Sequence, residues 1–161
     1  MHKFVDFLAK LLKEEIAYAH CDIPCGIYDP FRAQQAAHTI IRMTELLGKI
    51  DRTDEIKAEH DVARCTRVKE KHGDIVEEEL GTLQNDYFKE EHFKEYPTLS
   101  DLLNKTVKSS ILARQSISME AAEQTLSGVL EIAEIFFKTK KLTPVRIKSV
   151  YPTEREMVLY K

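Results

Sequence analysis

Apolar residues recur every three or four positions along most of the chain, a spacing typical of amphipathic helices. The pattern predicts four long helices, over residues 31–47, 54–88, 98–112 and 119–141. Four helices of this length, joined by short connections, predict an all-α fold in the form of an antiparallel four-helix bundle. The bundle is therefore expected to occupy residues 31–141.

The helix ends carry recognisable signals. Asp29-Pro30 precedes the first helix, since an Asp side chain can cap free N–H groups and Pro lacks an N–H. Gly48 is expected to end that helix in a left-handed conformation. Thr98 with Asp101 has the pattern of a capping box, and Ser118 can cap the fourth helix. Because Pro97 disfavours helix before it, we expect residues 89–97 to form a loop.

The last segment, residues 142–161, has a different pattern. Its sequence "VRIKSVYPTEREMVLYK" alternates apolar and polar residues as a strand does. One isolated strand is not stable in water, so we expect this C-terminal extension to pack on the bundle or on a partner subunit.

Composition narrows the possible partners and the compartment. The 161 residues suffice for one domain, and the net charge of -3 offers no basic surface for nucleic acid or an anionic membrane. No apolar run is long enough for a membrane-spanning helix. Three cysteines are an odd number and predict no disulfide framework, so we expect a cytoplasmic protein with reduced or metal-binding thiols.

Residues 1–19 are expected to be a leader that is removed. They have the periodicity of an amphipathic helix and end in Ala-Tyr-Ala, a small-x-small pattern typical of cleavage sites. Charged residues interrupt the apolar core that an export signal needs, so export is not predicted. Cleavage by a leader peptidase would make His20 the first residue of the mature chain.

Residues 20–30, "HCDIPCGIYDP", hold two of the three cysteines and are called the hook here. The C-x3-C spacing of Cys21 and Cys25 differs from a zinc knuckle, and no second pair completes a tetrahedron. After cleavage, the amine of His20, the next amide nitrogen and the Cys21 sulfur would form consecutive chelate rings, which Cys25 can close. Two nitrogens and two thiolates in a plane favour Ni(II) or Cu(II), with the His20 imidazole at the apical position.

The hook resembles the N-terminal nickel hook of nickel-containing superoxide dismutases at all eleven positions. The segments "DYFKEEHFKEYP" and "EIFFKTKK" are similar to the central segment and the last helix of that family. The resemblance implies a four-helix bundle made with a propeptide and assembled as a homohexamer. It also implies a nickel ion, held by His20, Cys21 and Cys25, that cycles between Ni(II) and Ni(III) while superoxide is converted to dioxygen and hydrogen peroxide.

The resemblance extends to residues around the metal. Tyr28 matches a tyrosine at the open face of the family's hook and is our candidate for gating access. Asp22 and Tyr87 match positions that shape the same pocket. A carboxylate and a basic side chain often orient the apical imidazole in the family, and these positions correspond to Ala36 and His72 here. The carboxylate is therefore missing, and His72 is the candidate for the basic partner.

Two other functions use the same residues. A nickel- or copper-binding bundle could deliver metal through this hook without turnover, and steady dismutation would separate it from an enzyme. A thiol-disulfide switch using Cys21 and Cys25 would need no free amine, so activity of an uncleavable leader variant would favour it.

Overall fold

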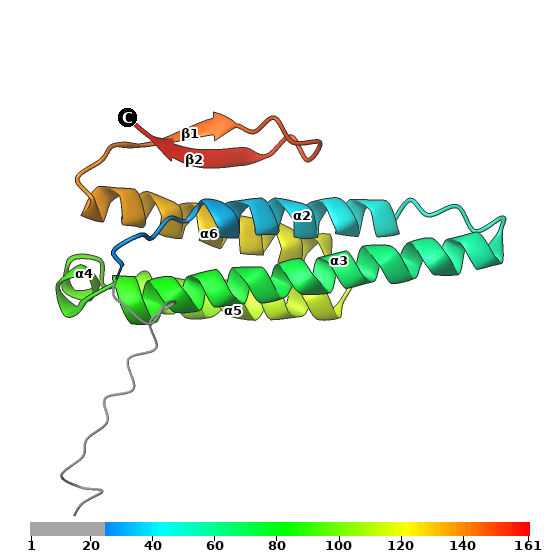
Figure 1. The fold of residues 1–161 in the computed structure, drawn as a ribbon, viewed down its shortest axis with the longest axis horizontal. Helices are drawn as coiled ribbons and strands as arrows, with labels where there is room; N and C mark the ends of the chain where they lie inside the picture. Colours follow the sequence, from blue (N-terminus) through cyan, green and yellow to red (C-terminus); the bar gives the residue numbers. More distant parts are fainter. Residues whose placement is uncertain (1–24) are drawn as a thin grey trace, which may run out of the picture.

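The structure is a computed structural model that describes residues 25–161. Its four long helices pack side by side as a bundle, with a two-stranded sheet against one side (Figure 1). The predicted all-α, antiparallel four-helix bundle is confirmed, with the sheet as an addition. The elements are α2 (Phe31–Leu47), α3 (Glu55–Thr82), the π-helical turn η1 (Leu83–Tyr87), α4 (Glu90–Glu95), α5 (Leu99–Gln115), α6 (Met119–Thr139), β1 (Pro144–Lys148) and β2 (Glu156–Tyr160).

Side-chain oxygens accept N–H groups at the start of three helices. Asp29 Oδ1 accepts the Phe31 N–H at 2.6 Å, Asp54 accepts the Lys57 N–H, and Ser118 accepts the Ala121 N–H. These contacts satisfy N–H groups that have no partner within the first turn of a helix.

Two predicted helix ends are wrong. Gly48 has a φ of -71° and continues the right-handed conformation of α2, so it does not end that helix as a left-handed residue. Thr98 makes no side-chain cap, because its backbone is already helical. Neither helix end needs the predicted left-handed glycine or side-chain cap, since neighbouring backbone groups make the terminal hydrogen bonds.

The predicted loop over residues 89–97 is also wrong in part, because it contains the short helix α4. The His92 ring accepts the Lys89 N–H at 3.1 Å and closes the first turn of this helix. The helix ends at Glu95, two residues before Pro97, where the restriction before proline takes effect.

α5 and α6 cross at very close range at Gly128. A Cβ added there would lie 2.0 Å from the Thr106 Oγ1 atom, so only glycine fits this position. Gly81, in α3, has no atom within 4 Å of the place that its Cβ would take. Gly128 and Gly81 therefore have opposite packing environments.

We predict that Gly128→Ala destabilises the protein by about 1–3 kcal/mol, because the overpacked crossing outweighs the helix propensity of alanine. The matched control Gly81→Ala should stabilise it by about 0.5–1 kcal/mol, since propensity acts there alone. Chemical unfolding of both variants measures the difference. Equal effects from the two substitutions would contradict the close crossing.

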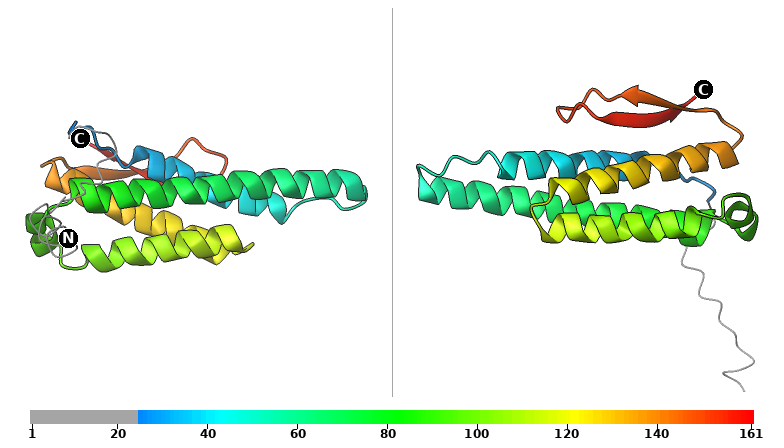
Figure 2. Two further views of the ribbon diagram at one scale, coloured as in Figure 1. Left: turned by 60° about the horizontal axis from the view of Figure 1, so that its bottom comes forward. Right: turned by 180° about the vertical axis from the view of Figure 1, so that it is seen from behind.

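The C-terminal extension forms an antiparallel hairpin that packs on the bundle, over α2 and α6 (Figures 1 and 2). The Gln34 side chain, from α2, bonds both backbone groups of Val158: its Oε1 accepts the N–H at 2.7 Å and its Nε2 donates to the carbonyl at 3.1 Å. Both backbone groups of Val158 in β2 thus have a hydrogen-bond partner in a helix side chain. The sequence left open whether this segment packs on the bundle or on a partner subunit. In the structure it packs on the bundle of its own chain.

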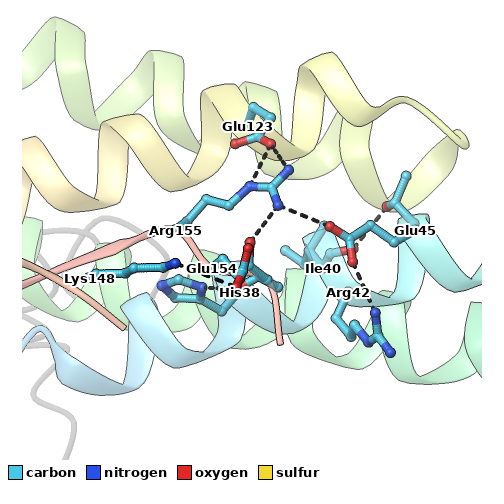
Figure 3. A network of polar contacts seen from close by, with 10 residues as sticks. His38, Ile40, Arg42, Glu45, Glu123, Lys148, Glu154 and Arg155 are labelled. Carbon is cyan, nitrogen blue, oxygen red and sulfur yellow. Dashed lines mark hydrogen bonds and ion pairs between the residues drawn. The ribbon is translucent and has the colours of Figure 1, made fainter. Parts of the chain in front are cut away.

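Arg155, next to β2, ties the hairpin to two helices (Figure 3). Its guanidinium bonds Glu123 of α6 at 2.6 Å and Glu45 of α2 at 3.1 Å. Beside it, the His38 ring is buried between the Thr153 hydroxyl, 2.7 Å from Nδ1, and the Glu156 carbonyl, 3.0 Å from Nε2. Since a carbonyl only accepts, Nε2 carries the proton and Nδ1 accepts from Thr153 in the neutral ring.

Burial lowers the pKa of His38 below its ordinary value of 6.5, and the positive charge of Arg155 acts in the same direction. The Glu156 carbonyl and the Glu123 carboxylate oppose the shift but do not reverse it. The folded protein therefore favours neutral His38. This contribution to stability is complete above the unfolded pKa and is lost as the pH falls from 6.5 through the lowered pKa.

We predict that stability falls between about pH 7.5 and about pH 5.5 by more in the wild type than in His38→Gln, because glutamine keeps a donor but does not titrate. Urea unfolding at the two pH values measures this. Identical pH dependence in both proteins would show that His38 does not control hairpin docking.

No helix in the part of the chain that the structure describes is long and apolar enough to cross a membrane.

Candidate metal centre

The described part of the hook begins at Cys25, whose side chain is exposed at the surface. Gly26 has a φ of 71°, a left-handed conformation that glycine adopts without strain. The Ile27 N–H donates to the Cys25 sulfur at 3.4 Å. His20, Cys21 and Asp22 lie outside the described residues.

The rest of the hook leads to one end of the bundle, where the ends of α3 and α6 and the short helix α4 come together (Figures 1 and 2). Tyr28 is half-buried against the hydrophobic core there. Its ring centroid lies 5.4 Å from that of Tyr87, in the π-helical turn η1. The structure therefore brings together two of the three residues that the sequence singled out for the pocket around the metal.

Tyr87 lies at the centre of an aromatic cluster. Its ring is 4.6 Å from that of Phe136, 5.1 Å from that of Phe88 and 5.7 Å from that of His92, onto which it stacks. Burial raises the pKa of the Tyr87 phenol, and its hydrogen bond to Thr139 opposes the shift. The side chain is therefore a neutral hydroxyl at physiological pH.

The sequence does not indicate the part that two residues at the end of α6 play at this site. The Thr139 hydroxyl lies 2.6 Å from the Tyr87 hydroxyl, and the Lys140 ammonium lies 4.8 Å from the centre of the Tyr87 ring. Lysines here suit a helix C-terminus, so the pattern alone does not indicate a ring contact. Only the close approach of α6 to η1 makes these residues part of the site.

The remaining candidates lie on α2 and α3. Ala36 is buried in the core and offers no carboxylate. His72 is half-buried on α3, and its Nδ1 atom lies 2.8 Å from the Val68 carbonyl of the same helix. Because this carbonyl can only accept, Nδ1 carries the proton and Nε2 stays as the atom through which His72 could contact another ring.

The residues of this site fit a soft metal only together with the beginning of the hook. Among residues 25–161, no group of three or more His, Cys, Asp or Glu side chains is placed to hold a metal ion. Cys25 is an exposed thiol beside Gly26 and can supply one sulfur ligand. Further ligands have to come from residues 20–24, where the sequence places His20 and Cys21.

The described residues thus define a four-helix bundle whose thiol-bearing hook is anchored on the aromatic end of the bundle. A model of the family "nickel-containing superoxide dismutase" matches residues 15–140. The chain belongs to this family. The sequence-based resemblance is confirmed, and the hairpin lies beyond the matched residues.

Individual relatives agree with this. The chain is 36% identical to a superoxide dismutase [Ni] from Streptomyces seoulensis over 76% of its own length and 89% of the relative's. It is 34% identical to a superoxide dismutase [Ni] from Streptomyces coelicolor over the same shares. A crystal structure of a Ni-containing superoxide dismutase superposes with a TM-score of 0.69 at 34% identity, covering 76% of this chain and 99% of that one.

Proposed function

We propose that this protein is a nickel superoxide dismutase that becomes active after cleavage before His20. The observation that carries the proposal is the hook itself. Cys25 is an exposed thiol, and Tyr28, three residues after it, is anchored on Tyr87. Membership of the family supplies the reaction, the disproportionation of superoxide to dioxygen and hydrogen peroxide.

The proposed ligands are the amine and imidazole of His20, the amide and thiolate of Cys21, and the thiolate of Cys25. When bound, nickel supplies the Ni(II)/Ni(III) couple that accepts an electron from one superoxide and returns it to the next. Thiolate and amidate donors are rich in electrons and lower the potential of such a couple. The N–H···S contact from Ile27 moderates the charge on the Cys25 sulfur.

Tyr28 is the proposed gate, because it lies in the hook close to Cys25 in sequence and its ring contacts the buried Tyr87 ring. Asp22 and Tyr87 shape the same pocket in this proposal. The Lys140 ammonium over the Tyr87 ring places positive charge beside the aromatic cluster, although the chain carries a net charge of -3. Restricted access also protects the thiolates from the peroxide that the reaction forms.

Processing, assembly and compartment complete the proposal. Residues 1–19 act as a propeptide that a leader peptidase removes, the mature chains assemble as a homohexamer, and the enzyme works in the cytoplasm. Family membership supports the assembly, and the Ala-Tyr-Ala before His20 supports the cleavage point. A free α-amine at His20 is the chemical requirement that connects processing to activity.

We predict that the processed chain binds stoichiometric nickel and dismutates superoxide, whereas a variant with an uncleavable leader does neither. Cys25→Ser should abolish both properties, because a hydroxyl is a poor substitute for a thiolate ligand. The matched control Cys65→Ser, a half-buried position on α3, should keep both. Metal analysis and pulse-radiolysis rates measure the two properties on the same samples.

The other outcomes identify the alternative functions. Nickel binding without turnover by the processed chain would support a metal-delivery protein. Full activity of the uncleaved chain, with a reversible disulfide in the absence of metal, would support the thiol-disulfide switch.

We further predict that His72→Ala changes the spectrum of the bound nickel and lowers activity, because His72 orients the apical imidazole in this proposal. His60→Ala, an exposed position on the same helix, is the control and should change neither. An unchanged spectrum and rate in His72→Ala would dismiss His72 as the basic partner.

A further inference from the structure

We propose that Thr139 is a positioning residue that holds the hydroxyl proton of Tyr87, so that the Tyr87 oxygen can act toward any other group only as a hydrogen-bond acceptor. The inference rests on the proposed function for its consequence in the reaction. The hydrogen-bond geometry that carries it lies entirely within the described residues.

Counting protons fixes the direction of the bond. The Thr139 Oγ1 atom lies 2.7 Å from the Phe136 carbonyl, which can only accept, so the single hydroxyl proton of Thr139 is directed there. The same Oγ1 atom lies 2.6 Å from the Tyr87 hydroxyl. Both contacts are satisfied only when Tyr87 donates its proton to Thr139.

Packing holds this arrangement in place. The Tyr87 side chain is 9% exposed, and its ring is surrounded by the rings of Phe136, Phe88, His92 and Tyr28. The ring is therefore fixed, and its oxygen stays within hydrogen-bond distance of Thr139. Thr139 is equally fixed, because it lies in the last turn of α6 and bonds to the backbone of that helix.

The direction of this bond affects which species Tyr87 can recognise. An anion such as superoxide or azide only accepts hydrogen bonds, so a phenol whose proton is committed to Thr139 presents lone pairs to it and does not hold it. A protonated species such as hydrogen peroxide can donate to the same oxygen. Thr139 therefore makes the Tyr87 hydroxyl unfavourable to the anionic substrate.

The first test observes the proton directly in the full chain without metal. In protein labelled with ¹³C at the tyrosine ring carbon that bears oxygen, the Tyr87 hydroxyl, assigned with Tyr87→Phe, should exchange slowly with solvent. Thr139→Val should make that exchange fast, and Thr139→Ser should restore it. Thr39→Val deletes a similar helix contact, to the Gln35 carbonyl, and is the control. Unchanged exchange in Thr139→Val would overturn the proposal.

The second test uses azide as the anion with processed, nickel-loaded protein. Thr139→Val frees the Tyr87 proton, so azide inhibition should become about 3- to 10-fold tighter, the value of one hydrogen bond. This gain should disappear in the double variant Thr139→Val with Tyr87→Phe. A merely structural role would weaken azide binding or leave it unchanged, and either result would overturn the proposal.

The two tests separate this inference from the proposed function. If the wild type takes up no nickel, the proposed function fails, and the exchange measurement on the metal-free chain still decides whether Thr139 directs the Tyr87 proton.

Discussion

The packing of Tyr28 on Tyr87 is the contact on which the candidate site depends. Tyr28 belongs to the hook and Tyr87 to the end of the bundle. Their contact, with ring centroids 5.4 Å apart, joins the segment that holds the candidate ligands to the core of the bundle. Tyr87 is in turn held by Phe136 and by Thr139 of α6. The described residues of the hook thus acquire a fixed position from the bundle core, as a preorganised binding site requires.

The C-terminal hairpin lies beyond the part of the chain that matches the family. Hydrogen bonds and ion pairs attach it to the bundle. The buried amide of Gln34 pairs with the backbone of Val158, and Arg155 joins Glu45 to Glu123. Because a buried amide such as that of Gln34 is costly to leave without partners, its two hydrogen bonds favour the observed register of the hairpin on the bundle. It touches the aromatic end of the bundle through the Tyr160 ring, 4.9 Å from that of Phe137.

The sequence predicts the parts of this molecule that depend on local periodicity and on short motifs. The four long helices follow from apolar spacing, and the caps at Asp54 and Ser118 follow from residue type. The hook could be identified from eleven consecutive residues. Contacts between distant residues could not: Gln34 and Val158 are 124 positions apart, and Tyr87 and Thr139 are 52 apart. Helix α4 was missed because a histidine ring, rather than a standard capping residue, closes its first turn.

The central claim is that a free α-amine at His20 completes the nickel site. The most direct test is the intact mass and metal content of the protein purified from its own cells. The account predicts a chain that begins at His20, carries nickel and dismutates superoxide. A fully active enzyme that still carries residues ahead of His20 would contradict it.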